Sequence, residues 1–214
     1  MTGSWMDPVM TGQPGTASPV IHASHDDVDV LSQLIADALH DDDVSRWLLP
    51  SPGIRRRILP GFFALLVQRA MTGGFVYTTP GKDGAAVWLA AGQPPSGYAE
   101  QLAEITGPWA TQFRVFDTVL AQHHPAGRAH HHLAILAVRP GQQNRGTGTG
   151  LLAAHHARLD QHATPGYLEA SSSRSRDLYL RHGYRPRPDS PIRLPGGPPM
   201  WPMWREPRHV ARRE

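Results

Sequence analysis

The sequence predicts a single α/β (α+β) domain, and two features of the 214-residue chain indicate it. An apolar run at 132–138 is followed by a glycine-rich segment and then by an apolar-periodic helix from Leu151, which is a strand–loop–helix unit. Two further strands, at 74–79 and 85–90, flank Pro80-Gly-Lys-Asp-Gly84, a composition typical of a hairpin turn. A chain of this length can bury one sizeable hydrophobic core.

The remaining elements follow from apolar spacing and from turn residues. In order, we expect a short strand at 20–23, a helix from Asp26 that ends at Asp41-Asp42-Asp43, a turn at 44–50, a helix at 56–72, a partly helical segment at 94–126, a strand at 167–171, a helix from Ser173 to a C-capping Gly183, and a strand-like segment at 184–204. Seven prolines in that last segment should confine its pairing to strand ends or to an irregular hairpin.

Both ends of the chain lack hydrophobic periodicity. Residues 1–18 are rich in glycine, proline and hydroxyl side chains and are expected to be a disordered extension. Residues 207–214 are expected to be a flexible tail, which leaves 19–206 as the folded domain.

Composition excludes several classes of function. The chain has no cysteine, so a disulfide framework, a thiolate metal site and a cysteine nucleophile are impossible. Its formal net charge is +3 and its arginines are scattered without interleaved aromatic residues, so we expect no nucleic-acid partner. No apolar stretch approaches the length of a membrane span and no signal-peptide pattern is present, so the protein is expected to be cytoplasmic with no membrane partner. Adjacent histidines at 130–132 and 155–156 cannot converge on one ion, so we expect no metal.

The loop between the 132–138 strand and the following helix predicts an anion site. Glycines at 146, 148 and 150 let backbone amides approach a ligand, and the helix N-terminus adds about half a positive charge. The lysine of a P-loop is missing after Gly146, and a dinucleotide fingerprint would need its third glycine in another register. The pattern that remains is Gln143-x-x-Gly146-x-Gly148.

This pattern resembles the acyl-coenzyme-A loop of the GNAT-type N-acetyltransferases. The segment Leu178-Tyr-Leu-Arg-His-Gly-Tyr184 is similar to the one that closes GNAT domains. Residues 36–43 and Ala86-Val-Trp-Leu89 resemble the first helix and third strand of the branch that includes the puromycin N-acetyltransferases. The resemblance spans about residues 20–205. It implies a GNAT fold, with a mixed, mostly antiparallel, splayed central sheet flanked by helices, and acetyl-CoA as co-substrate.

The resemblance also implies which residues bind the coenzyme. Free backbone groups of the splayed strand would hold the pantetheine arm, and loop amides would hold the pyrophosphate. Carried over, the strand groups are Leu136, Ala137 and Val138, and the amides run through Gln143, Asn144, Arg145, Gly146, Thr147 and Gly148. Ser175 stands where the family usually has an asparagine that touches the coenzyme, which leaves that contact in doubt.

Three side chains are candidates for the proton transfers of acetyl transfer to an amine. Tyr179 matches the family tyrosine near the coenzyme-A sulfur, and a phenol with a pKa near 10 suits protonation of a thiolate. His132 falls where histone-modifying members carry a glutamate base, on a strand face that we expect residues 130, 132, 134, 136 and 138 to share. Glu169 matches a glutamate of the puromycin branch and is the alternative base, or an anchor for the substrate ammonium.

The acceptor side is less specific. Asp42 and Asp43 would favour a cationic acceptor, and Asp42 aligns with a tyrosine of the puromycin branch, which argues against puromycin itself. We expect an enzyme that acetylates a primary amine of a small molecule, namely an antibiotic, an aminonucleoside or a biosynthetic intermediate. The alternatives are a protein N-terminal or lysine acetyltransferase and a non-catalytic coenzyme-A-binding regulator. A homodimer is expected by analogy with the family alone.

Overall fold

The computed structural model describes residues 19–90 and 95–208. Its strands are β1 (Ile21–His22), β2 (Phe75–Thr78), β3 (Gly84–Ala90), β4 (His131–Val138), β5 (Gly166–Ala170), β6 (Arg185–Pro186), β7 (Ile192–Arg193) and β8 (Pro199–Arg205). Its helices are α1 (Val28–Leu39), α2 (Asp43–Leu48), α3 (Pro52–Gly73), α4 (Tyr98–Thr106), α5 (Ala110–His123), α6 (Thr147–Gln161) and α7 (Ser173–Arg181), with short 3-10 turns at His25–Asp27 and Gly107–Trp109.

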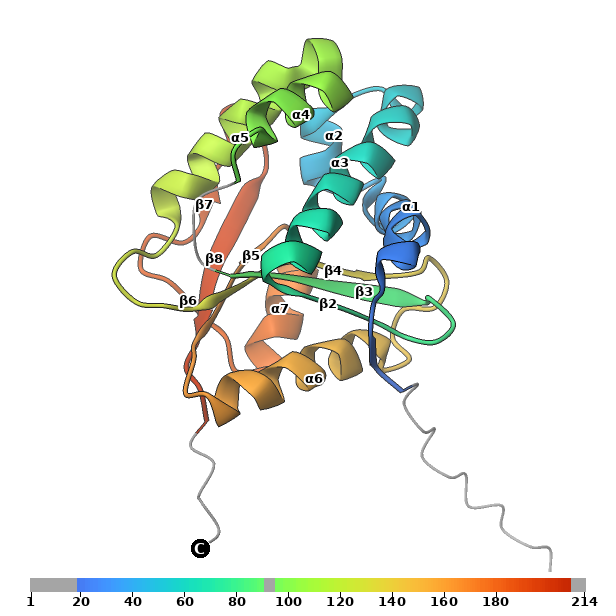
Figure 1. Ribbon diagram of the computed structural model, residues 1–214. Coiled ribbons are helices and arrows are strands. Elements are labelled where there is room, and N and C mark those ends of the chain that lie inside the picture. The colour runs from blue at the N-terminus through green and yellow to red at the C-terminus, as the bar shows by residue number, and fades with distance from the viewer. Residues whose placement is uncertain (1–18, 91–94, 209–214) are drawn as a thin grey trace, which may run out of the picture.

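One open sheet carries all of the described strands, with helices on both of its faces (Figure 1). The strand order is β1-β2-β3-β4-β5-β8-β6, and β7 pairs with β8 beside this path. Neighbouring strands are antiparallel, except that β4 and β5 run parallel. The predicted fold class, a mixed and mostly antiparallel sheet flanked by helices, is therefore confirmed.

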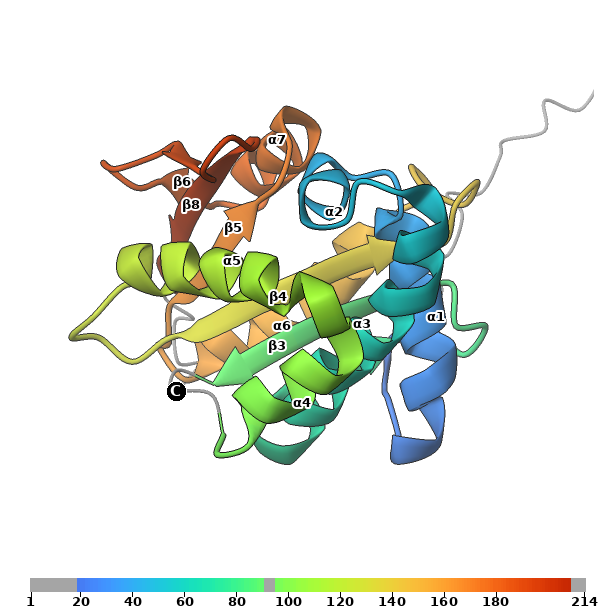
Figure 2. The same cartoon turned by 90° about the horizontal axis from the view of Figure 1, so that it is seen from above.

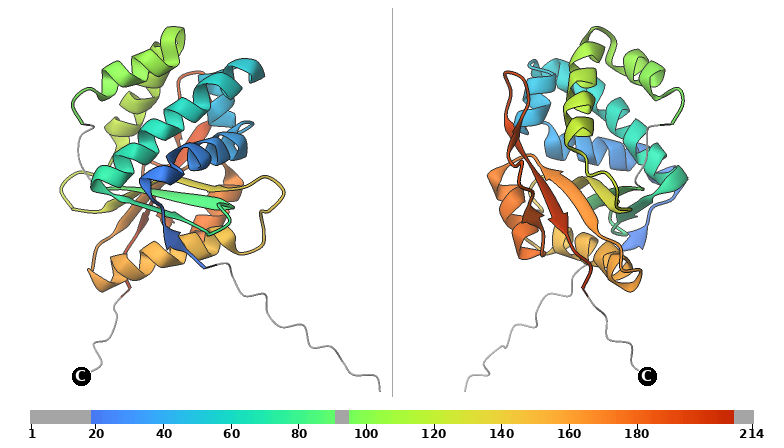
Figure 3. Two further views of the ribbon diagram at one scale, coloured as in Figure 1. Left: turned by 45° about the vertical axis from the view of Figure 1, so that its right-hand side comes forward. Right: turned by 90° about the vertical axis from the view of Figure 1, so that its left-hand side faces the viewer.

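Two hydrophobic cores lie on opposite faces of the sheet (Figure 3). Helices α1 to α5 pack on one face, where Leu31 and Leu59 meet Val87 of β3. Helices α6 and α7 pack on the other face, where Leu152 meets Trp88 and β5 contributes Leu168. Burying an aliphatic or aromatic side chain of this size contributes about 1.5–3 kcal/mol, so both faces of the sheet are anchored by packing.

A bulge in β4 changes which way its side chains point. Val87 lies opposite Ile135 and Trp88 lies opposite Leu133, so Ala134 is an extra residue in β4. Ala134 and Ile135 both pack into the core under α1 to α5, while Leu136 packs on the α6 side. The prediction that residues 130 to 138 alternate without interruption is therefore wrong, because the bulge reverses the alternation between residues 134 and 136.

Pairing between β4 and β5 ends after three residues. The last partners are Leu133 and Leu168, although β4 continues to Val138 along β3 and β5 continues to Ala170 along β8. Beyond this point the two strands separate, as Figure 2 shows. Among the described residues, the β5 side of residues 134–138 is thus left without a strand partner, which is the splay that the sequence resemblance predicts.

Two predicted boundaries differ from the structure at the N-terminal helices. We expected Asp41 to Asp43 to end the first helix, but α1 stops at Leu39 and Asp42 is the N-cap of a separate helix, α2. The Asp42 side chain accepts a hydrogen bond from Val44 N at 3.0 Å, so these acids lie at a helix N-terminus, where the helix dipole favours them. Helix α3 starts at Pro52, because proline at the first helical position loses no hydrogen bond.

Contrary to our expectation, the prolines of the last segment do not confine its pairing to strand ends or to an irregular hairpin. Strand β8 contains Pro199 and Pro202 and lies between β5 and β6. The carbonyl of Pro202 accepts from Arg187 N at 2.9 Å, so the backbone of this residue faces away from β5. Its missing N–H is therefore not needed in the long ladder between β5 and β8.

Helix α6 buries two adjacent histidines against the sheet. His155 is fully buried, stacks on Trp88 with ring centroids 4.1 Å apart, and makes hydrogen bonds with His131 and with the Tyr77 hydroxyl. His156 makes a 3.1 Å hydrogen bond with the Tyr184 hydroxyl. Burial lowers the pKa of His155 to about 2 and that of His156 to about 3, so both are neutral packing groups.

These pKa values predict that the fold loses stability in mild acid. The unfolded chain binds protons at these histidines below about pH 6.5, whereas the folded chain does not, so stability is present above that pH and is lost as the pH falls. We expect the free energy of unfolding to fall by about 3 kcal/mol from this pair between pH 6.5 and pH 5. Chemical denaturation at a series of pH values measures this slope.

A variant separates the histidine effect from that of the carboxylates. His156→Asn keeps a hydrogen-bonding group beside Tyr184 but cannot titrate, so roughly half of that slope should disappear. His162→Asn, at an exposed position, should leave the slope unchanged. An identical slope in the His156→Asn variant would contradict this assignment.

Candidate functional site

The gap between β4 and β5 opens into a cleft of about 480 Å³. Its walls come from the end of α1, the free end of β4, the loop before α6 and one side of α7. The residues that line it are Ala38, Leu39, Leu136, Ala137, Val138, Gln142, Gln143, Asn144, Gly146, Thr147, Gly148, Thr149, Arg174, Ser175, Leu178 and Arg181. Every predicted coenzyme-binding residue except Arg145 belongs to this set, and Arg145 is exposed in the same loop.

The loop before α6 presents backbone amides to this cleft. Gly146 is the N-cap of α6 with φ +87°, a left-handed conformation that glycine adopts without steric cost. The first amides of a helix have no partner within the helix, and the first turn of α6 holds no acidic residue. The Gln143 side chain folds the loop, because its Oε1 accepts from Gly141 N and its Nε2 donates to Val138 O. This geometry can bind a phosphate or pyrophosphate group.

Helix α7 contributes cleft residues that the sequence analysis did not name. Arg174, Leu178 and Arg181 line the cleft and share one face of α7, at spacings of four and three residues. Helical spacing from the predicted Ser175 reaches Leu178, and the same spacing counted from Leu178 reaches Arg174 and Arg181, so this periodicity was the signal that could have found them. The Ser175 hydroxyl bonds within its own helix end, to the Ser172 carbonyl and hydroxyl at 3.0 Å each.

Tyr179 lies in the core between α7 and the sheet rather than among the residues that line the cleft. It is 7 % exposed, and its ring meets that of Tyr184 edge-on at 5.7 Å. Burial raises the pKa of Tyr179 above its ordinary value, so the phenol keeps its proton at neutral pH. The next residue toward the helix start, Leu178, is part of the cleft wall.

The two candidate bases are brought together at the point where the strands part. His132 Nε2 lies 2.7 Å from Glu169 Oε2, and their side chains are 15 % and 4 % exposed. Glu169 is the first β5 residue after the last pair with β4. Burial acts to raise the pKa of Glu169, but the charge and hydrogen bond of His132 outweigh it, so the pKa is lowered and the group is a carboxylate.

Two further side chains lie beside this pair, and the sequence analysis did not identify them. The rings of His124 and Tyr167 lie 5.2 Å and 5.4 Å from that of His132, and His124 makes a 3.0 Å hydrogen bond with His130. Burial, with a smaller effect of the His132 charge, lowers the pKa of His124 to about 4. His124 directly follows α5, and the loop that joins α5 to β4 brings it back beside His132.

Of the two acidic residues predicted to bind the acceptor, Asp42 fixes the connection between α1 and α2. Asp42 accepts from Ser171 Oγ at 2.8 Å, which ties the start of α2 to the loop after β5, and burial raises its pKa. Both of its carboxylate oxygens are thus engaged, since the other caps α2. Asp43 is exposed on the first turn of α2.

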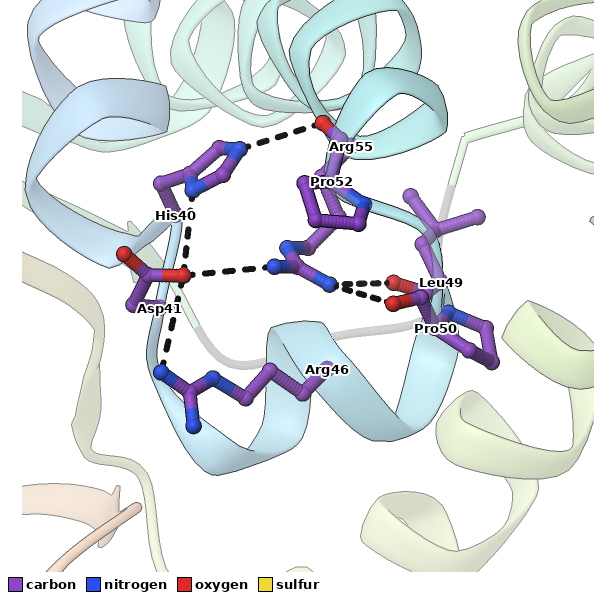
Figure 4. A network of polar contacts seen from close by, with 7 residues as sticks. All are labelled: His40, Asp41, Arg46, Leu49, Pro50, Pro52 and Arg55. Atoms are coloured by element: carbon purple, nitrogen blue, oxygen red, sulfur yellow. Dashed lines mark hydrogen bonds and ion pairs between the residues drawn. The ribbon is translucent and has the colours of Figure 1, made fainter.

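A buried arginine fixes the connection between α2 and α3 (Figure 4). Arg55 is 3 % exposed, and its Nη1 donates to the carbonyls of Leu49 and Pro50 at 2.9 Å each. Its Nη2 donates to Asp41 at 3.2 Å, and Asp41 also faces Arg46. Asp41 is 66 % exposed, so water screens its charge and the two carbonyl bonds carry most of the stabilisation.

The described residues show no other type of site in this region. Within 19–90 and 95–208, no group of three histidine, aspartate or glutamate side chains could hold a metal ion. The helices of the same residues include none that is long and apolar enough to cross a membrane.

Comparison with known proteins gives the same fold. Residues 115–206 match the acetyltransferase (GNAT) domain family. A solved structure described as histone acetyltransferase HPA2 and related acetyltransferase, from Corynebacterium glutamicum, superposes with a TM-score of 0.69 at 24 % identity, covering 92 % of this chain and 99 % of that one. Arylalkylamine N-acetyltransferase 2 from Aedes aegypti has a TM-score of 0.58 at 12 % identity, with coverages of 89 % and 99 %. The chain therefore has the GNAT acetyltransferase fold, and its C-terminal part matches the family in sequence.

The Arg55 contacts predict a large loss of stability on truncation. Arg55→Ala would leave two carbonyls without their donor and remove a buried side chain, so we expect the free energy of unfolding to fall by about 2–4 kcal/mol. Urea denaturation measures the change. Arg56→Ala, at the adjacent exposed position, should change stability by less than about 0.5 kcal/mol. Equal effects of the two substitutions would show that the network contributes nothing.

Proposed function

We propose that this protein transfers acetyl from acetyl-CoA to a primary amine of a small molecule, by direct attack within a ternary complex. The observation that carries the proposal is the cleft itself. An unpaired strand edge, a left-handed glycine at a helix N-terminus and two arginines on α7 all line one cavity, at the place where the strands part. The match of residues 115–206 to the GNAT acetyltransferase domain supports the same reaction.

The coenzyme would be held largely by backbone. The amides from Gln143 to Gly148 suit the pyrophosphate, and the exposed arginines 174 and 181 add positive charge beside it. The β5 side of Leu136 to Val138, free of a strand partner, offers amide and carbonyl groups to the amides of the pantetheine arm. Acetyl-CoA supplies an activated thioester, so the protein has only to orient the amine and move protons.

The His132–Glu169 contact supports a division of roles between the two candidate bases. A carboxylate accepts hydrogen bonds and cannot donate them, so His132 donates from Nε2 to Glu169. Neutral His132 then has its lone pair on Nδ1, which can accept a proton from the substrate ammonium, and the neutral amine so formed attacks the thioester. Glu169 orients the imidazole and stabilises its protonated form, and we propose it as the positioning residue.

Tyr179 is the proposed acid. It stands four residues before Gly183, as in the family segment, and burial keeps its phenol protonated. As the amine nitrogen bonds to the acetyl carbon and the carbon–sulfur bond breaks, the phenol proton passes to the departing thiolate. The proton that the nitrogen loses as it becomes an amide restores the phenol through solvent.

The acceptor is proposed to be an antibiotic, an aminonucleoside or a biosynthetic intermediate of the kind modified by the puromycin N-acetyltransferase branch. The residues at 36–43 and 86–89 support that branch. Exposed Asp43 at the edge of the site favours a cationic acceptor, whereas Asp42 is occupied by Val44 and Ser171. The neighbour described as a histone acetyltransferase keeps a protein acceptor as the second candidate.

Acetyl-CoA-dependent thiol release tests the function directly. The panel contains aminonucleosides, aminoglycosides, polyamines and a lysine peptide, and the chain contributes no thiol of its own because it has no cysteine. We expect rapid release with one class of small amine. Release with the peptide alone would indicate a protein acetyltransferase, and tight coenzyme binding without release would indicate a regulator.

A matched pair of tyrosine variants accompanies this assay. Tyr179→Phe should lower kcat roughly 10²-fold and leave acetyl-CoA affinity nearly unchanged, because only the proton donor is lost. Tyr184→Phe removes a second buried phenol, the one bonded to His156, and should keep kcat within about twofold while lowering stability. Equal kcat in the wild type and the Tyr179→Phe variant would remove Tyr179 from the mechanism.

Substitution of the dyad separates base from positioning residue. His132→Asn should lower kcat by about 10²-fold, and Glu169→Gln by roughly tenfold or more. In the Glu169→Gln variant KM for the amine should stay within about twofold, because a residue that only orients the imidazole does not bind the substrate. If Glu169→Gln instead raised KM for the amine and left kcat unchanged, Glu169 would be the ammonium anchor.

A further inference from the structure

A second pocket lies at the open edge of the sheet, away from the coenzyme cleft. It has a volume of about 590 Å³ and is bordered by the turn after α7, by β6 with the residues that follow it, and by the end of β8 with the residues after it. It shares no lining residue with the cleft. The proposed reaction makes no use of it.

The walls of this pocket are strongly basic. Arg185, Arg187, Arg205 and Arg208 line it, against the single carboxylate of Glu206. That carboxylate is already engaged, because it accepts from Arg128 and from Trp204 Nε1 at 2.9 Å each. Among the described residues, no carboxylate forms an ion pair with the guanidinium of Arg185 or Arg208. The part of the chain that the structure describes therefore leaves this pocket with an excess of positive charge.

Buried nitrogen atoms in this wall lack hydrogen-bond partners. Arg205 is 3 % exposed, and its Nη2 bonds to Asp160 at 2.8 Å, but its Nε and Nη1 have no acceptor. Arg187 Nε is buried as well, and its nearest carboxylate oxygen, on Asp189, is 3.8 Å away. Buried donors of a charged group are normally satisfied, and within residues 19–90 and 95–208 nothing supplies the acceptors that these nitrogen atoms require.

Two of these arginines lie beside the glycine that ends α7. Gly183 has φ +90°, and a Cβ at this position would lie 3.8 Å from Arg208 Nη2 and 3.9 Å from Arg205 Nε. A guanidinium group presents several donors in one plane and matches the oxygens of a phosphate. Prolines 186, 188 and 207, together with the Trp204 ring, add an apolar wall beside the charged one.

We propose that this pocket binds a small phosphate monoester, with its phosphate on the arginines and its organic part against Trp204 and the prolines. The proposal goes beyond acetyl transfer and does not depend on it. Inorganic phosphate and phenyl phosphate are the probes, titrated calorimetrically into the full-length protein in chloride buffer. We expect saturable binding, with phenyl phosphate at least about tenfold tighter than inorganic phosphate because it also contacts the apolar wall.

Two double variants, each of which removes two positive charges, show where phenyl phosphate binds. Arg185→Gln/Arg208→Gln changes exposed pocket residues and should weaken phenyl phosphate binding at least about tenfold. Arg174→Gln/Arg181→Gln makes the same charge change in the coenzyme cleft and should leave that binding intact. Amine-dependent thiol release by the pocket variant should equal that of the wild type, so failure of either proposal can be recognised separately.

Three outcomes would overturn the proposal. Equal binding by the wild type and the pocket variant would show that the arginines of the pocket do not form the site. Loss of binding in the cleft variant alone would place phosphate in the cleft. Equal affinity for inorganic phosphate and phenyl phosphate would show that the organic part of the ligand makes no contact with the pocket, which contradicts a monoester site.

Discussion

The short pairing between β4 and β5 is the constraint on which the rest of the site depends. Each strand is fully committed to its outer neighbour, β4 to β3 and β5 to β8, and the two share only three residue pairs. The bulge at Ala134 turns β4 further, because a bulge bends the strand that contains it. A parallel pair that ends in the middle of a sheet leaves backbone groups unpaired and opens a cleft between the two cores.

Everything proposed to act in catalysis is arranged around that gap. The glycine loop lies beyond the end of β4, α7 follows β5, and the His132–Glu169 pair lies at the vertex where the strands still touch. The hydrogen bond from Ser171 to Asp42 joins the loop after β5 to the start of α2 across the same region. These elements are far apart in sequence, and the divergence of two strands gives them one common site.

Histidines of this chain show how the environment decides the role of one residue type. His155 and His156 lie on the buried face of α6, are held neutral by desolvation, and serve as hydrogen-bonding core residues. His132 instead meets a carboxylate at 2.7 Å, which gives its imidazole a defined tautomer. In the sequence these residues belong to similar short runs, His130-His-His132 and His155-His156, and nothing local separates a packing histidine from a candidate base.

Much of the architecture was predictable because it rests on local patterns. The apolar run of β4, the hairpin of β2 and β3, the glycine loop and the serine-to-glycine limits of α7 all follow from periodicity and capping within a short window. The predicted coenzyme residues formed one cleft for the same reason, since most of them are consecutive along a strand and its loop. Local rules failed at Asp42, which begins a second helix instead of ending the first, and at the bulge of β4. They also failed at Pro202, because a strand accepts a proline only where its missing N–H faces away from the paired neighbour.

The sequence by itself therefore determined the fold class and the position of the glycine loop that we propose as the anion site, because both depend on residues adjacent in the chain. Only the tertiary structure decided that His132 and Glu169 form a pair, that Tyr167 and His124 surround it, and that Arg185 and Arg208 share a pocket. Those outcomes depend on strand register and on helix packing across dozens of intervening residues. Register and packing are set by burial of the whole sheet, and no local window of the sequence contains that information.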